Sequence, residues 1–399
     1  MAATRRVQCG KGCTADAAFT LPIARSGPTA AAHRADGLPR PGIRRVCDDG
    51  RMSNEAARSA ADPDSPDVSL HSGEGHGDTA VPAGAGSSAI TELGHDVFQI
   101  DTRMAGYPGV TAAYLIRSER PCLVETGTGP SAPVVRDALA VLGIGPGDLA
   151  TVVVTHIHLD HAGGAGDIAG MFPHADVVVH ERGARHLVDP SRLMKSARMV
   201  YGDELDELFG GLAPTPVDRI RAVEETGTVD LGGGRRLDSH YSPGHAKHHV
   251  GLLDSVTGDL YVGDAAGVYI PETADLRPAS PPPDFDLETA LTSLRMFASL
   301  RPARLLFSHF GPVGAVDEVL ARSAEELHVW VDEVSRAHGA GLNLDHVVAM
   351  VHERTKERYA VFGPDADADV AARFARGGGT ASNVAGIMHW LDRSGAARA

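Results

Sequence analysis

Four side chains of the kind that bind metals are crowded into six positions directly after a short β-branched run. The run, residues 151–155, contains no charged residue and predicts a buried strand, because β-branched side chains fit a pleated surface. The crowded side chains begin where this strand ends: His156, His158, Asp160 and His161. Their nitrogen and oxygen atoms suit zinc, iron or manganese, and the H-x-H-x-D-H order favours two adjacent metals over a polar loop that is merely rich in histidine.

Two coordination shells need further ligands from elsewhere in the chain, and three candidates lie at the ends of strand-like runs. His245 lies in a Ser-Pro-Gly-His turn between two such runs. Asp264 ends a short apolar run, where an aspartate can bridge two cations that otherwise repel each other. His309 follows another apolar run and shortly precedes a Gly-Pro pair that breaks the chain. Each residue alone could be a capped turn or an exposed polar group, but together they predict one shared metal centre.

The order of these seven residues resembles that of the metallo-β-lactamase superfamily, which includes glyoxalase II, lactonases, RNase Z and persulfide dioxygenases. The resemblance covers roughly residues 93–312. It implies an α/β fold, a four-layer αββα sandwich with a dinuclear metal site at one edge of its two sheets. It also implies two groups of ligands joined by a shared aspartate: His156, His158 and His245 for one metal, Asp160, His161 and His309 for the other, with Asp264 between them.

Two further residues are expected to support the metal ligands. Glu125 stands in a Val-Glu-Thr-Gly segment that matches an early motif of the superfamily, in which an aspartate is usual, and we expect it to orient a ligand histidine. His249 stands where many relatives carry a second histidine after the turn. We interpret it as packing against the ligands or orienting them, and not as a ligand itself.

The chain divides into segments of different composition. Residues 1–89 are rich in Ala, Gly, Pro, Ser and Arg without sustained periodicity, and we expect a disordered or non-native extension, with a targeting segment as the alternative. Residues 90–312 are expected to form the catalytic domain, with a helical insertion at about 185–215. Residues 313–399 carry apolar side chains at helical spacings and predict a C-terminal helical region. That region could cover the site, dimerise or bind a partner.

Composition argues against several classes of partner. The formal net charge of −15 argues against nucleic-acid binding, which needs clustered Lys and Arg. No run of about 18 apolar residues predicts a membrane span. The four cysteines are too few and scattered to stabilise a fold of this size, which favours a reducing, cytoplasmic location. We expect a small-molecule substrate, and an oligomer formed through the helical regions is an open alternative.

The resemblance implies a metallo-hydrolase that uses two divalent metal ions, for which we expect zinc, with iron or manganese as alternatives. Two close cations lower the pKa of a bridging water from about 15.7 toward neutrality, so a metal-bridging hydroxide is the expected nucleophile. Asp160 is expected to orient this nucleophile while serving as a ligand. The expected substrate is an ester, thioester or lactone, as for glyoxalase II-like and lactonase-like members. Three residues are candidates for binding it: Tyr201, Tyr269 and Arg277.

Other functions on the same scaffold remain open. One is a mononuclear iron enzyme that oxidises persulfides with oxygen, and another is a phosphodiesterase. A non-enzymatic binding module is disfavoured, because loss of activity would be expected to cost at least one ligand. An oxygen-reducing flavodiiron protein is also disfavoured, because no flavin-binding domain is recognisable after residue 312.

Overall fold

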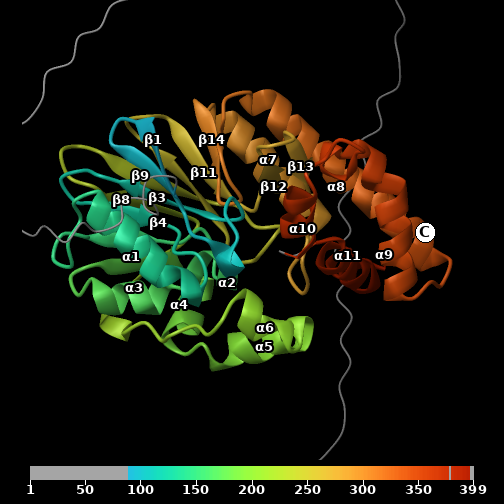
Figure 1. Cartoon of the computed structure of the whole chain (residues 1–399), viewed down its shortest axis with the longest axis horizontal. Coiled ribbons are helices and arrows are strands. Elements are labelled where there is room, and N and C mark those ends of the chain that lie inside the picture. The colour runs from blue at the N-terminus through green and yellow to red at the C-terminus, as the bar shows by residue number, and fades with distance from the viewer. Residues whose placement is uncertain (1–88, 377–378, 396–399) are drawn as a thin grey trace, which may run out of the picture. The chain divides into compact units, whose positions relative to one another are not determined.

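Two β-sheets form the centre of the described part of the chain, which comprises residues 89–376 and 379–395 of a computed structural model (Figure 1). The expected N-terminal extension lies outside these residues, apart from its last position. The first sheet has seven strands in chain order: β1 (Ile90–Gly94), β2 (Val97–Asp101), β3 (Ala112–Ile116), β4 (Cys122–Val124), β5 (Thr151–Val153), β6 (Asp176–His180) and β7 (Ile220–Val223). Strands β1 to β4 pair antiparallel, and β4 to β7 pair parallel.

The second sheet has six strands in the order β15-β14-β11-β10-β9-β8. Their bounds are β8 (Thr226–Asp230), β9 (Arg236–Tyr241), β10 (Val250–Asp254), β11 (Asp259–Gly263), β14 (Arg304–Phe307) and β15 (Pro312–Val313). The parallel pair β11 and β14 is linked through the hairpin of β12 (Val268–Ile270) and β13 (Asp275–Arg277) and through helix α7 (Leu287–Leu300). A parallel pair needs such a long crossover connection.

Strand β3 shows why both faces of the first sheet are buried. Successive side chains of a strand point to opposite faces, so Ala113 and Leu115 pack into the core beneath α1 (Ala132–Val141) and α3 (Ala165–Met171). Tyr114 points the other way, into the core between the sheets, where its ring meets that of Tyr261 at 5.3 Å. Since α7 and α8 (Val316–Gly339) cover the outer face of the second sheet, the predicted four-layer fold is confirmed.

Helices fill the stretch at which we expected an insertion. They are α4 (Glu181–Val188), α5 (Ser191–Tyr201) and α6 (Glu204–Leu208). Leu205 and Leu208 anchor this segment in the core, whereas no residue of α5 is fully buried. The helix α5 therefore lies against the domain with one partly buried side.

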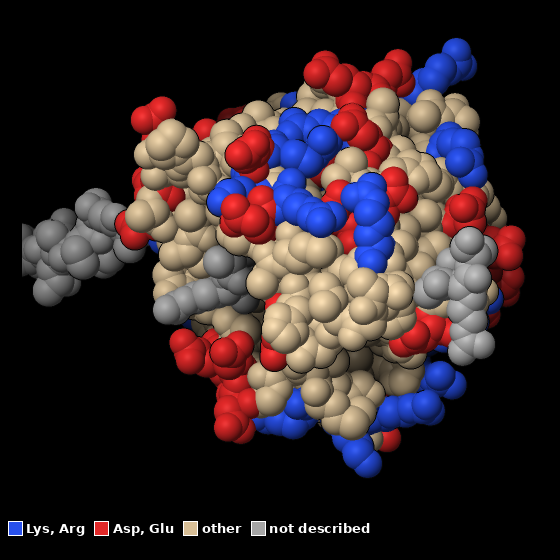
Figure 2. All heavy atoms as spheres, turned by 90° about the vertical axis from the view of Figure 1, so that its right-hand side faces the viewer, with Lys and Arg blue, Asp and Glu red and all other residues tan. Residues whose placement is uncertain are grey.

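The C-terminal region is helical as predicted. It contains α8, α9 (Leu344–Thr355), α10 (Ala368–Arg376) and α11 (Thr380–Ser394), and its charged side chains of both signs intermingle on the face shown in Figure 2. Asn343 caps α9, because its Oδ1 accepts a hydrogen bond from the His346 amide at 3.1 Å. Helix α11 packs so closely on the chain that a Cβ at Gly386 would overlap the Ser280 carbonyl oxygen. Among the described residues, no helix is both long and apolar enough to cross a membrane.

Candidate metal centre

The ends of strands from both sheets meet at one edge of the sandwich. After β5 the chain leads to the short helix α2 (Leu159–Ala162), with His158 at its N-cap position. Asp264 directly follows β11, His309 lies two residues after β14, and His245 lies in the turn between β9 and β10. At this edge the structure brings together all seven side chains that the sequence singles out.

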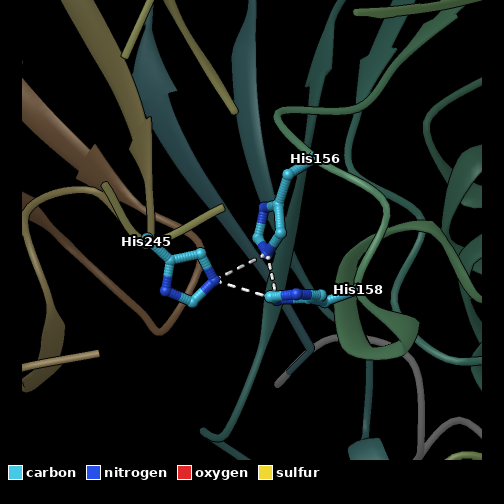
Figure 3. Close-up of side chains that lie close together, drawn as sticks. All are labelled: His156, His158 and His245. Carbon is cyan, nitrogen blue, oxygen red and sulfur yellow. Dashed lines mark hydrogen bonds between the residues drawn. The ribbon is translucent and has the colours of Figure 1, made fainter. Parts of the chain in front are cut away.

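Three imidazoles converge on one point (Figure 3). His245 Nε2 lies 2.9 Å from His158 Nδ1 and 3.2 Å from His156 Nε2, and the last two nitrogens are 3.0 Å apart. Three nitrogens at these mutual distances could hold a metal ion as a three-histidine donor set.

The other candidate ligands form a second group beside the first. His161 Nε2 and His309 Nε2 each lie 3.5 Å from Asp160 Oδ2. Asp264 lies between the groups: its Oδ1 is 3.3 Å from His161 Nε2, while its Oδ2 is 3.6 Å from His245 Nε2. One oxygen thus faces each group, the arrangement that a bridging carboxylate requires.

Hydrogen bonds behind the rings aim their lone pairs into the cluster. His245 Nδ1 lies 3.0 Å from the Ala279 carbonyl and His309 Nδ1 lies 3.0 Å from the Val110 carbonyl, so both Nδ1 atoms must donate. His156 Nδ1 lies 3.0 Å from Thr155 Oγ1. Since the Thr155 hydroxyl donates its proton to Glu125 Oε1 at 2.5 Å, His156 Nδ1 is again the donor. In each ring the Nε2 atom therefore faces the centre and is the nitrogen that can bind a metal.

The two expected supporting residues lie directly behind the ligands. Glu125 Oε1 lies 3.4 Å from His161 Nδ1 and also accepts a hydrogen bond from Ser308 Oγ at 3.0 Å. His249 Nε2 accepts a hydrogen bond from the Asp264 amide at 3.2 Å. This close approach depends on Gly263, whose φ is 51°, because a Cβ there would collide with the His249 ring. Both residues are positioned to orient ligands, and their roles stay predictions.

The two groups differ in electrostatics when no metal is bound. Burial, together with the neighbouring imidazoles, lowers the pKa of His156 well below its usual range and that of His158 to about 4. Burial also disfavours charge on His309, but the Asp264 and Asp160 carboxylates outweigh it and raise the pKa of His309 to about 9. The same carboxylates raise the pKa of His161. One group is therefore neutral and the other is a set of charged pairs.

Two buried atoms at the centre fit a missing cation. His161 Nε2 and Asp264 Oδ1 are shielded from solvent and lie 3.3 Å apart as an ion pair, but neither has the geometry of a hydrogen bond with any residue that the structure describes. Buried polar atoms without a hydrogen bond are rare in folded proteins, and an ion bound between these two could supply the missing interaction. The nitrogen and carboxylate donors suit a divalent metal such as zinc, so the residues present fit the implied metals.

A cavity opens over the cluster, with about 920 Å³ of space that includes its opening to solvent. His158, Asp160, His245, Asp264 and His309 form its floor. Its walls come from α5, from Phe209, from a proline-rich segment at 278–283 and from α11, which contributes Ser382 and Asn383. A concave, largely apolar cavity with a few convergent polar groups is typical of a small-molecule site.

The three candidate substrate-binding residues lie in different surroundings. Tyr201 lines the cavity and packs on Phe209, with ring centroids 4.8 Å apart. Tyr269 packs on Phe307 at 5.7 Å, and among the described residues its neighbour Val268 lines the cavity in its place. Arg277 is buried behind the floor between the rings of Trp330, Tyr359 and Phe362. Tyr201 alone of the three is thus placed at the cavity.

Sequence reasoning missed several residues at the site. Ser382 and Asn383 reach the cavity from α11, and the sequence carries no local signal of this. His248 stacks on His156 at 6.2 Å, and its place in the run of histidines after His245 was the available signal. Cys122, the free cysteine among the described residues, is buried in the core between the sheets, away from the cavity.

Known proteins share this architecture. The crystal structure of the metallo-beta-lactamase family protein TTHA1429 from Thermus thermophilus superposes on 76% of this chain and 96% of its own, with a TM-score of 0.55 and 19% identity, which supports the fold. The putative diflavin flavoprotein A 1 of Thermosynechococcus vestitus is 25% identical over 265 residues. The match covers 63% of this chain but 42% of the flavoprotein.

A nearer relative is the metallo-beta-lactamase fold-containing protein ST1585 of Sulfurisphaera tokodaii, which is 34% identical over 194 residues, or 45% of this chain and 69% of the relative. The archaeal ST1585 crystal structure, from Sulfolobus tokodaii, covers 58% of this chain and 86% of its own, with 26% identity and a TM-score of 0.50. The sequence model of the metallo-beta-lactamase superfamily matches residues 106–309, about half of the 399 residues. The strand-end ligands, the four layers and these matches agree: the chain belongs to the metallo-β-lactamase superfamily.

Proposed function

We propose that the protein is a metal-dependent hydrolase that cleaves an ester, thioester or lactone. The observation that carries this proposal is the pair of convergent donor groups at the floor of a cavity, with Asp264 between them. Membership of the superfamily supports it, because that superfamily includes metallo-hydrolases. The catalytic roles of Asp160 and Tyr201 are part of the proposal.

The proposed cofactor is a pair of divalent metal ions, for which we propose zinc. His156, His158 and His245 would hold one ion, Asp160, His161 and His309 the other, and Asp264 both. When bound, such ions lower the pKa of a water molecule toward neutrality and polarise a substrate carbonyl.

The residues of the chain then position the reactants. During hydrolysis, the water oxygen bonds to the acyl carbon, the bond from that carbon to the leaving oxygen or sulfur breaks, and the leaving atom gains a proton. We propose that Asp160 orients the water, because it lines the cavity and its side chain keeps 15% of its surface exposed. Tyr201 also lines the cavity, and burial raises its pKa to about 12. Its hydroxyl therefore stays protonated near pH 7 and can donate a hydrogen bond to the substrate.

A second candidate function is oxygen chemistry at iron. The similarity to a putative diflavin flavoprotein favours it, and the same nitrogen and carboxylate donors suit iron. Against it, residues 316–395 form helices and no further sheet wherever the structure describes them, so this part of the chain offers no α/β flavin-binding fold.

The test measures metal content and turnover on the same samples. The full chain is purified, its metals are quantified by mass spectrometry, and it is assayed with 4-nitrophenyl acetate, an aryl thioester, a γ-lactone, bis(4-nitrophenyl) phosphate and, for oxygen uptake, a persulfide. We expect two zinc ions per chain and hydrolysis of at least one acyl substrate. His158→Ala should lose both, while His174→Ala, a matched change at an exposed histidine, should keep both. Acyl hydrolysis that survives complete metal removal, or iron with oxygen uptake and no hydrolysis, would overturn the proposal.

A further inference from the structure

The walls of the cavity lack the cations that a charged substrate needs. Among the described residues, those that line it include neither Lys nor Arg. Its walls are instead apolar over most of their length: Leu193, Ala197 and Val200 from α5, then Phe209, then Pro278 and Pro281–Pro283 opposite. A carboxylate placed among these side chains would lose its hydration without gaining a partner.

Three basic side chains on neighbouring elements are already engaged or lie outside the cavity lining. On α5, Arg198 donates two hydrogen bonds to Asp206, at 2.6 and 2.9 Å, and Lys195 is exposed outside the cavity lining. Arg277 lies behind the floor, enclosed by aromatic rings, and donates to Thr380 Oγ1 at 3.2 Å. None of these three is placed to pair with an anion in the cavity.

The polar groups of the walls fit a neutral substrate. Asn383 is used in holding the wall together, since it donates to the Pro278 carbonyl at 2.8 Å and accepts from the Ser280 amide at 2.7 Å. The Tyr201 hydroxyl, hydrogen-bonded with Ser382, is a neutral donor. The Ser196 and Ser382 hydroxyls also line the cavity, and neutral groups of this kind suit a carbonyl or ether oxygen.

The apolar surface continues from the floor to the solvent. Val200 lines the cavity and is 49% exposed, and the adjacent Met199 is 74% exposed. In Figure 2, the hollow in the lower part of the molecule is bordered largely by uncharged residues. A chain of methylene groups could thus run from the floor between α5 and the 278–283 segment and leave beside Val200.

We propose that the substrate is a neutral acyl compound with an apolar chain of medium length, and not one that carries a carboxylate along that chain. This inference rests on the proposed hydrolase function. The carbonyl lies over the metal cluster beside Tyr201, and the chain lies against Leu193, Ala197 and Phe209. The C-terminal helix α11 is, in this arrangement, part of the substrate site.

Hydrolysis of a matched series of esters tests the chain-length preference. With 4-nitrophenyl acetate, butyrate, hexanoate and octanoate, kcat/KM should rise by about threefold to fourfold per added methylene until the cavity is filled. Mono-4-nitrophenyl suberate equals the octanoate in length but ends in a carboxylate, and we expect its kcat/KM to be at least about tenfold below that of the octanoate. A flat chain-length series, or equal rates for suberate and octanoate, would overturn the inference while leaving the proposed hydrolysis intact.

A pair of tryptophan substitutions on α5 locates the effect. In Ala197→Trp the indole occupies the part of the cavity beside α5, so the ratio of kcat/KM for octanoate to that for acetate should fall about tenfold or more. Lys195→Trp, the control, places the same side chain outside the cavity lining and should leave the ratio unchanged. Equal ratios in the two variants would contradict the proposal that this side of α5 contacts the acyl chain.

A binding measurement separates the inference from the proposed function. N-phenyl-1-naphthylamine should fluoresce on binding to the His158→Ala protein, and octanol should displace it at a concentration at least about tenfold below that of octanoate anion. If no ester is hydrolysed but octanol is preferred, the proposed function fails and the assignment of the cavity stands. If octanoate displaces the probe as well as octanol does, the inference is wrong whatever the enzyme activity.

Discussion

Asn383 and Ser280 are joined by two hydrogen bonds across 103 positions of sequence. The Ser280 amide donates to Asn383 Oδ1 at 2.7 Å, and Ser280 Oγ donates to the Asn383 carbonyl at 3.3 Å. The residue before Ser280 is Ala279, whose carbonyl accepts the hydrogen bond from His245 Nδ1. Helix α11 therefore holds the segment that orients a candidate metal ligand.

Asn383→Ala should impair both stability and activity. Loss of the amide leaves the Ser280 N–H and the Pro278 carbonyl without their partners in a buried place, which should lower the free energy of unfolding by about 1–3 kcal/mol. We expect kcat/KM to fall as well, because the 278–283 segment, which orients His245 through the Ala279 carbonyl, loses its hydrogen bonds to the Asn383 side chain. Asn343→Ala is the control, since removal of this helix cap should cost about 1 kcal/mol but leave activity unchanged. Urea unfolding and ester hydrolysis measure both, and equal activities of the two variants would count against a role for α11 at the site.

Asp264→Asn should weaken the binding of both metals. One carboxylate oxygen faces each ligand group, so the substitution removes the shared negative charge from both. His309→Ala should instead leave one tight equivalent, because the three-histidine group stays complete. Titration of metal-free protein with zinc against a chromophoric chelator separates the two patterns. If Asp264→Asn still binds one zinc ion per chain tightly, Asp264 is not shared between the two ligand groups.

Glu125→Gln should lower metal affinity by about 10- to 100-fold while the protein stays folded. The substitution keeps the shape of the side chain but removes the negative charge that lies 3.4 Å from His161 Nδ1. Gln can still accept the hydrogen bonds of Thr155 and Ser308. The same chelator titration measures affinity, and circular dichroism checks the fold. An unchanged affinity would assign Glu125 to packing alone.

Metal-free protein should lose stability as the pH rises from about 6.5 to about 9. The pKa of His309 is raised from 6.5 to about 9 in the folded chain, so the folded state binds a proton that the unfolded state releases first. The resulting stabilisation is complete below pH 6.5 and disappears as the pH passes 9. Thermal melts in the presence of a chelator should show this slope, and His309→Gln should reduce it to the part contributed by His161, whose pKa the same carboxylates raise. A melting temperature of the wild type that is constant over this range would contradict the charged pairs described for the metal-free site.

The candidate ligands could be identified from the sequence because each one stands in a local pattern at a strand end or in a turn. Asp264 and His309 end apolar runs that became β11 and β14, and strand ends from two packed sheets meet at a common edge. The C-terminal helices could be predicted from the helical spacing of their apolar residues. In each case residue type and spacing within a short segment were sufficient for the prediction.

The walls of the cavity could not be predicted in the same way. Ser382 and Asn383 lie on a helix whose pattern indicates burial on one side and nothing about its neighbour. Arg277 was a candidate for substrate binding because it follows Asp264 closely in sequence, yet β13 carries it into the core of the helical region. The positions of these residues relative to the cavity depend on how elements distant in sequence pack together, and a single sequence carries no direct information about that packing.

The candidate metal ligands lie at the edge of the sheets, whereas α5 and α11 supply much of the cavity wall. Helix α5 lies in sequence between His161 and His245, and α11 follows His309, so neither helix carries a candidate ligand. Descendants of this chain can therefore diverge in the compounds that they admit through changes confined to two helices, while the proposed metal centre is inherited unaltered.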